Sequence, residues 1–98
     1  MIEPIFLDLE YGPNAPFIFI IGVMEDNEIM QWFIESEDQE EHDLSKLLDM
    51  VKERPTKTWI TYSGVSADVP ILKKRLEKHR LRLPACFKIV DLFYDIIT

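Results

Sequence analysis

Cysteine is almost absent from this chain of 98 residues, in which Cys86 is the single example. An internal disulfide is therefore impossible, and no spacing of cysteine and histidine suited to zinc occurs. A chain without disulfides suits a reducing compartment, so we expect a cytoplasmic protein.

Long apolar runs are also missing. No segment reaches the roughly 20 apolar residues that a membrane-spanning helix needs, and residues 1–4 lack the basic region of a signal peptide. We therefore expect neither membrane insertion nor export. A content of 47% hydrophobic and 30% charged residues is typical of a soluble globular protein, and 98 residues suffice for one domain.

Basic residues are scarce, because 11 Lys and Arg stand against 18 Asp and Glu, for a net charge of -7. This balance argues against a simple electrostatic clamp on nucleic acid, which depends on Lys and Arg beside phosphates. The bases are unevenly placed, since residues 73–98 contain 7 of the 11 and only 3 of the acids. The cluster at 73–82 is either a solvated helix face or a phosphate-contacting edge beside a carboxylate site.

The pattern of apolar residues predicts three strands followed by a helix, a fourth strand, a second helix and a fifth strand, without an internal repeat. The continuous run 16–24 is expected to be a central strand buried on both faces. Arg54-Pro55 ends the first helix, and the second runs from Asp68 until Leu83-Pro84 breaks it. The five predicted strands cover residues 4–9, 16–24, 29–34, 57–62 and 87–92.

Ser36 is the expected N-cap of the first helix. The acids of its first turn, which complement the helix macrodipole, then have a local structural explanation; they are Glu37, Asp38, Glu40 and Glu41. The large aromatic residues are assigned to the core; they are Phe17, Phe19, Trp32, Phe33 and Trp59.

The order β-β-β-α-β-α-β predicts an α/β fold with a mixed five-stranded sheet. Three strands joined by tight turns place the first strand centrally, and right-handed crossovers add the later strands. The fourth strand is then the parallel neighbour of the first. Ligands in such sheets collect beyond the carboxyl ends of the parallel strands.

Two carboxylates, Asp8 and Glu10, lie two residues apart at the end of the first strand. Side chains at i and i+2 of a strand point to the same face, so these like charges need a compensating cation. Mg²⁺ or Mn²⁺ fits, because both prefer oxygen ligands. Asp68 follows the loop after the fourth strand and can converge with the pair. Alternatively, the pair ends a strand in solvent and Asp68 caps the second helix.

The strand order, Phe6-Leu7-Asp8-Leu9-Glu10 and the stretch 62–75 (YSGVSADVPILKKR) together resemble the ribonuclease H-like fold of the DEDD 3′-to-5′ exonuclease superfamily. Within it, they are similar to a largely uncharacterised prokaryotic branch associated with RecB-like nucleases. The resemblance covers essentially the whole chain. It implies that Asp8, Glu10 and Asp68 are catalytic acids that bind Mg²⁺ or Mn²⁺. Ser63 and Ala67 depart from the Asn and Phe of the family pattern.

The resemblance also implies a fourth acid on a helix after the fifth strand, and neither Asp91 nor Asp95 fits that motif. We therefore expect residues 1–98 to be a single, C-terminally truncated ribonuclease H-like domain of weak or no activity. A sheet without its last helix leaves one face partly uncovered, which favours homodimerisation through that face.

The function that follows is a metal-dependent nuclease, a 3′-to-5′ exonuclease on single-stranded DNA or RNA. Tyr11, Lys73, Lys74 and Arg75 are the candidate substrate-binding residues. The alternative is a non-catalytic interaction or nucleic-acid-binding module that retains the fold. A receiver-type phosphotransfer domain is a weaker third alternative, because that fold starts with alternating β-α units.

Overall fold

A computed structural model describes residues 4–11, 18–61 and 68–91. The elements follow the predicted order β-β-β-α-β-α-β, which is thereby confirmed. No helix in these three segments is both long and apolar enough to cross a membrane. The elements are β1 (Ile5–Glu10), β2 (Ile20–Glu25), β3 (Glu28–Phe33), α1 (Glu37–Glu53), β4 (Thr58–Thr61), α2 (Asp68–Lys78) and β5 (Lys88–Asp91).

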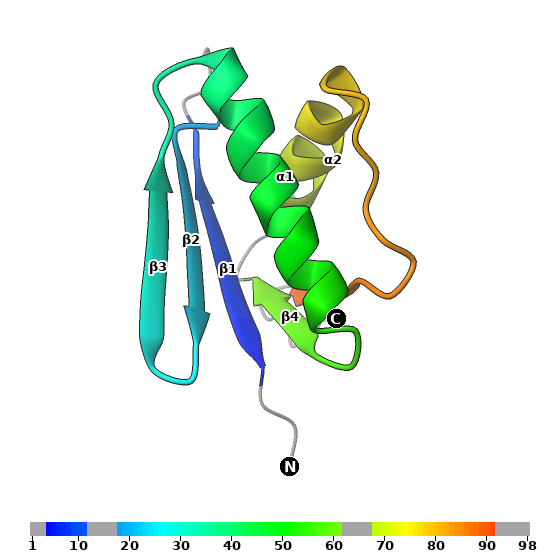
Figure 1. Ribbon diagram of the computed structural model, residues 1–98. Coiled ribbons are helices and arrows are strands. Elements are labelled where there is room, and N and C mark those ends of the chain that lie inside the picture. Colours follow the sequence, from blue (N-terminus) through cyan, green and yellow to red (C-terminus); the bar gives the residue numbers. More distant parts are fainter. Residues whose placement is uncertain (1–3, 12–17, 62–67, 92–98) are drawn as a thin grey trace.

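The strands form one mixed sheet in the order β3-β2-β1-β4-β5, with β1 in the centre. Strands β1, β2 and β3 pair antiparallel, whereas β4 lies parallel to β1 on its other side (Figure 1). The parallel register joins Ile5 to Trp59 and Phe6 to Ile60. The predicted fold class, the central first strand and its parallel fourth-strand neighbour are confirmed.

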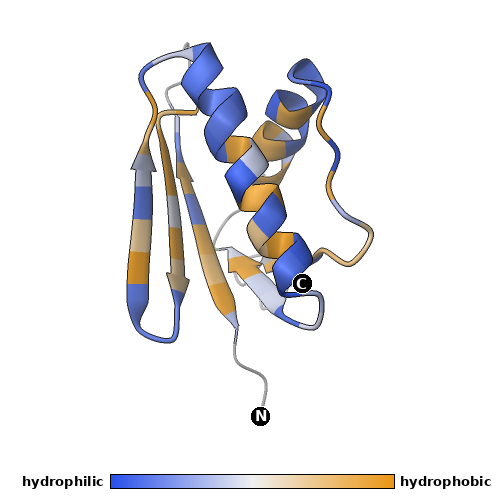
Figure 2. Cartoon of the chain, in the orientation of Figure 1, coloured by the Kyte–Doolittle hydropathy of each residue, from blue (hydrophilic) through white to orange (hydrophobic). Residues whose placement is uncertain are grey.

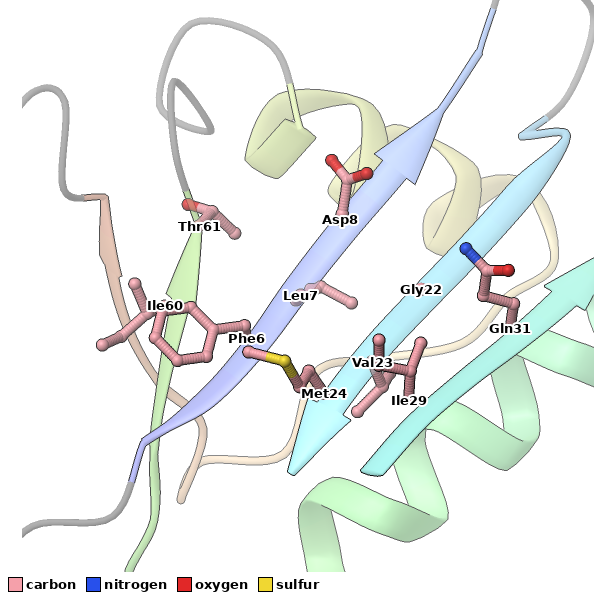
Figure 3. A pocket seen from close by; sticks show the side chains of 10 residues that line it. All are labelled: Phe6, Leu7, Asp8, Gly22, Val23, Met24, Ile29, Gln31, Ile60 and Thr61. Carbon is pink, nitrogen blue, oxygen red and sulfur yellow. The ribbon is translucent and has the colours of Figure 1, made fainter. Parts of the chain in front are cut away.

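Both described helices pack on one face of the sheet, as seen from the opposite side in Figure 3, where they lie behind the strands. Buried residues along β1 alternate with exposed ones, and the buried residues of β1 form one core with those of α1 and α2. Figure 2 shows hydrophobic residues in all three of these elements. We call the other side of the sheet the open face. The core consists of Ile5, Leu7, Leu9, Ile18, Ile21, Val23, Ile34, Leu44, Leu47, Leu48, Val51, Trp59, Leu72 and Leu76.

The ends of the elements follow local chemistry. Ser36 caps α1 by accepting a hydrogen bond from the backbone N–H of Gln39 at 3.2 Å, which confirms the predicted N-cap. The turn between β2 and β3 is formed by Asp26 and Asn27, which have φ angles of 52° and 67°. Short polar side chains tolerate this left-handed conformation, and such a turn matches the twist of a hairpin.

Helix α2 is shorter than predicted, because it ends at Lys78 rather than near Leu83. Arg80 has a φ of 59° and follows the helix, and the N–H of Leu81 bonds to the carbonyl of Leu76 at 2.8 Å. This pattern is a Schellman ending, in which a left-handed residue turns the chain away. Glycine is the usual residue at the left-handed position after a helix, so the arginine at position 80 did not indicate from the sequence that the helix ends there.

Two predictions about burial were wrong. Strand β2 is buried on one face only, since Ile21 and Val23 are buried whereas Ile20, Gly22 and Met24 are half-buried. Among the aromatics assigned to the core, Phe19 is 40% exposed and Phe33 is 61% exposed, whereas Trp59 is fully buried and Trp32 packs against the core. Phe17 lies outside the described residues. Phe33 and the half-buried residues of β2 lie on the face of the sheet that neither described helix covers.

Candidate functional site

Asp8 and Glu10 are exposed on the open face of the central strand β1. Leu7 and Leu9 alternate with them and are buried beneath the helices, which fixes the orientation of the strand. Asp8 and Glu10 therefore lie on the same face of the strand, as predicted. Across the antiparallel pairing, Asp8 lies opposite Gly22 and Glu10 opposite Ile20.

A pocket of about 350 Å³ opens beside Asp8 on the open face. Gly22 contributes to it by lacking a side chain: a Cβ there would lie 3.6 Å from the Asp8 carbonyl oxygen and 3.9 Å from the Asp8 Cβ, which is ordinary contact. The neighbouring strand presents Gln31 opposite Gly22. Figure 3 shows Asp8 and Gln31 on either side of Gly22, with apolar side chains below them.

The third predicted acid, Asp68, is the first residue of α2. That helix follows β4, the parallel neighbour of β1, as the sequence predicted. The side chain of Asp68 is not among those that the structure describes, and Ser63 and Ala67 also lie outside the described residues. Within the described segments, no three side chains of His, Cys, Asp or Glu are grouped so that they could hold a metal ion. Convergence of Asp68 with the pair therefore stays a prediction.

The four candidate substrate residues have different environments. Tyr11 is half-buried and packs against the core, following the buried face of β1. Lys73 and Lys74 are exposed on α2. The Arg75 side chain is only 14% exposed and forms an ion pair with Glu40, its Nη2 lying 2.6 Å from Oε1. An intramolecular partner thus accounts for Arg75 without any substrate, and its substrate role stays an untested prediction.

Glu40 is a fully buried carboxylate in the first turn of α1, and it joins three parts of the chain. It accepts hydrogen bonds from the guanidinium of Arg75, from the backbone N–H of Ile18 at 2.8 Å and from His79 Nε2 at 2.7 Å. His79 must donate through Nε2, because an ionised carboxylate only accepts. The helix macrodipole is therefore not the main reason for an acid at this position.

Opposing effects act on the pKa of Glu40. Burial is the largest and would raise it, but the hydrogen bonds from Arg75, Ile18 and His79, together with the charge of Arg75, hold the pKa below its ordinary value. The hydrogen bond to Glu40 in turn raises the pKa of Arg75. Both groups are therefore charged at neutral pH, as a buried ion pair requires.

Sequence reasoning missed this buried cluster, although a periodic signal was present. Arg75 and His79 share the helical stripe of Leu72 and Leu76, and Glu40 continues the stripe that begins with Leu44 in α1. Charged residues in register with an apolar stripe indicate a buried pair between two helices. The partners lie 35 residues apart, so only the packing of α1 on α2 identifies them.

The donor set of the acid pair suits a hard divalent cation. Asp8 and Glu10 offer carboxylate oxygens on an exposed surface, and such ligands are typical of Mg²⁺ and Mn²⁺. Asp68 begins the helix after the adjacent parallel strand and is the predicted third ligand.

The fold and the pair define a class of protein: an α/β domain with a mixed five-stranded sheet and acids on its central strand. A family model described as the RNase_H superfamily matches residues 5–98. The chain therefore belongs to the RNase H superfamily, and this membership suggests a nuclease-like function. No match was found among the curated proteins.

Proposed function

We propose that this chain is a metal-dependent nuclease domain of the DEDD type that hydrolyses phosphodiesters of single-stranded DNA or RNA from the 3′ end. Its activity is weak in this proposal, because neither Asp91 nor Asp95 fits the motif of the fourth acid. The observation that carries the proposal is the exposed pair Asp8 and Glu10 on the central strand of an RNase H superfamily chain. Two exposed like charges on adjacent positions of one face are unfavourable unless a cation or solvent compensates them.

In this proposal Asp8 and Glu10 bind the divalent cation, with Asp68 as the third ligand. When bound, such a cation polarises the scissile phosphate and activates a water for in-line displacement. The chain itself positions the ligands: the buried residues Leu7 and Leu9 fix β1 in the core, so both acid side chains are presented from a rigid strand.

Metal binding is the direct test. Titration with Mn²⁺ should broaden the amide signals of Asp8, Glu10 and their neighbours in β2, because a paramagnetic ion relaxes nearby nuclei. Asp8→Asn should abolish the effect, since an amide is a poorer ligand than a carboxylate. Asp49→Asn, which alters an exposed acid on α1, is the matched control and should leave it unchanged. Uniform broadening in both variants would contradict a specific site.

Cleavage is tested with oligonucleotides labelled at the 5′ end, using DNA and RNA in parallel with Mg²⁺ or Mn²⁺. A ladder that shortens from the 3′ end supports the proposal, and Asp8→Asn should reduce the rate by at least about a hundredfold, because a catalytic metal contributes several kcal/mol. Cutting that persists in Asp8→Asn or without divalent cations would refute the role of the pair.

A non-catalytic binding module is the second candidate, and the exposed apolar residues of the open face favour it. Phe6 is 39% exposed, Ile29 69% and Phe33 61%. Exposed apolar residues on one face of a sheet often mark an interaction site. Saturable oligonucleotide binding without metal-dependent cleavage would favour this function over the nuclease.

A further inference from the structure

The buried carboxylate of Glu40 holds together two parts of the chain, each of which leads to a predicted metal ligand. Its Oε2 accepts a hydrogen bond from the backbone N–H of Ile18 at 2.8 Å. Its Oε1 accepts from Arg75 Nη2 at 2.6 Å and from His79 Nε2 at 2.7 Å. A single side chain therefore connects the backbone before β2 with the helix α2, which lies beside α1 in Figure 1.

The first connection leads to Glu10. The residue after Ile18 is Phe19, whose backbone N–H donates to the carbonyl of Glu10 at 2.8 Å. The carbonyl of Phe19 in turn accepts a hydrogen bond from the N–H of Ile34 at 2.7 Å. Residues 18 and 19 thus lie against the last residue of β1, and a displacement of Ile18 would move the backbone that carries Glu10.

The second connection leads to the start of α2. Arg75 lies two helical turns, about 10 Å, after Asp68, and His79 directly follows the helix. A continuous helix of this length moves as a rigid element. Glu40 holds its C-terminal half, so the position of its first residue, the predicted third ligand, is set from the buried cluster.

Folding stability alone does not account for charges at this place. Replacing a buried ion pair by apolar side chains of similar size is often neutral or stabilising. Apolar burial is non-directional, however, whereas the planar fork of a guanidinium fixes the orientation of the carboxylate that it binds. Acids on β1 and at the start of α2 repel each other when no cation is bound. A directed connection between the two elements opposes that repulsion.

We propose that Glu40 is a positioning residue for the metal site, which fixes the end of β1 that bears Glu10 relative to the helix that begins with Asp68. The inference rests on the proposed nuclease function, because the metal site belongs to that function. Glu40 is fully buried and touches neither metal nor substrate, so it acts through the backbone of Phe19 and through α2. Ligands must be held to within about 0.5 Å for a productive site, which gives such a residue its effect.

The test compares two double variants with wild type, using Mn²⁺ as the probe. Glu40→Leu with Arg75→Met, the apolar double variant, removes the directed bonds but keeps a packed interior. Glu25→Leu with Arg54→Met is the matched control, because it removes an ion pair of 2.8 Å at the opposite end of α1. Circular dichroism establishes that each protein is folded at the temperature used.

Electron paramagnetic resonance of free Mn²⁺ gives the dissociation constant. The apolar double variant should bind Mn²⁺ about tenfold more weakly or worse, as is typical when a group that orients metal ligands is lost. The control should bind as wild type does. A residue that only stabilised the fold would leave the affinity of the folded apolar variant unchanged, and that result would overturn the proposal. Equal weakening in both double variants would overturn it too.

Hydrogen exchange in EDTA examines the connection without metal. The amide of Phe19 should exchange about tenfold faster in the apolar double variant than in the control, because Ile18 has lost its acceptor and the bond to Glu10 opens locally. Equal exchange of this amide in the two double variants would refute the connection through Ile18.

The failure of this inference is distinguishable from that of the proposed function. If Asp8→Asn binds Mn²⁺ as wild type does, the metal site is refuted and the positioning role with it. If binding depends on Asp8 but the apolar double variant retains the wild-type affinity, the nuclease proposal stands and the positioning role of Glu40 alone is refuted.

Discussion

Glu40→Ala is the change with the largest expected effect on stability. The carboxylate is fully buried and accepts hydrogen bonds from Arg75, Ile18 and His79. Removing it leaves the guanidinium of Arg75, whose side chain is 14% exposed, without its main counter-charge. Breaking a buried pair by removing one partner costs about 3–5 kcal/mol.

That loss is large compared with the total stability of a typical domain, about 5–15 kcal/mol. At roughly 4–8 °C per kcal/mol for a chain of this size, the unfolding temperature should fall by roughly 10–40 °C. Urea titration with linear extrapolation measures the change in unfolding free energy. The exposed acid of the same helix, Asp49, provides the control, since Asp49→Asn should change stability by no more than about 0.5 kcal/mol.

A loss of less than about 1 kcal/mol in Glu40→Ala would refute this reasoning, because it would equal the contribution of an exposed ion pair. A second variant tests the electrostatic origin of the effect. Glu40→Leu combined with Arg75→Met replaces both partners by apolar side chains, and it should be markedly more stable than Glu40→Ala. The double-mutant cycle then gives the coupling energy of the pair.

The dependence on pH follows from the same carboxylate. The folded protein holds the pKa of Glu40 below its ordinary value of 4.5. The group is then ionised in both states above that pH, and its contribution to stability is fully present there. Below about pH 4.5 the unfolded chain takes up the proton first, so this contribution is lost progressively as the pH falls through the folded pKa. Wild type should lose more stability than Glu40→Gln between pH 5 and pH 3, by urea titration at each pH; parallel curves would contradict the assignment.

Further predictions concern α2, the cap of α1 and the open face. Replacing both Lys73 and Lys74 by alanine should leave thermal stability unchanged and reduce the salt dependence of oligonucleotide binding. Arg75→Ala, in contrast, should destabilise the fold. An unchanged salt dependence would show that the two lysines belong to an ordinary solvated helix surface. Ser36→Ala should cost about 1 kcal/mol in urea titration through loss of the N-cap, and a neutral result would show that the cap is dispensable. Phe33→Lys should change stability by about 0.5 kcal/mol or less, because the side chain is 61% exposed; a large loss would mean that a covering partner is present.

Local patterns explain why the order of elements could be predicted. The period of two along β1 placed Asp8 and Glu10 on one face, because consecutive strand residues alternate by geometry alone. Ser36 was identified as a cap because its short side chain competes for the first free N–H groups of a helix. The position of β4 beside β1 followed from the handedness of crossovers.

The errors concern contacts between distant segments. Phe19 and Phe33 were assigned to the core because aromatic residues are usually buried. Phe33 instead lies on the open face, which no described helix covers, and Phe19, just before β2, is 40% exposed. The acid at position 40 was assigned to the helix macrodipole because its partners are far away in sequence. Arg75 was grouped with the neighbouring lysines because a linear charge run does not distinguish the buried side of a helix from the exposed side.

The sequence by itself determined the α/β order, the central carboxylate strand and the candidate ligands Asp8 and Glu10, because these follow from short-range geometry and hydrophobic periodicity. Only the tertiary structure decided which face of the sheet is covered, that Gly22 and Gln31 shape a pocket beside Asp8, and that Glu40 pairs with Arg75. Each of these depends on the packing of segments that are distant in the chain, where burial and charge pairing select one arrangement among many that local patterns allow.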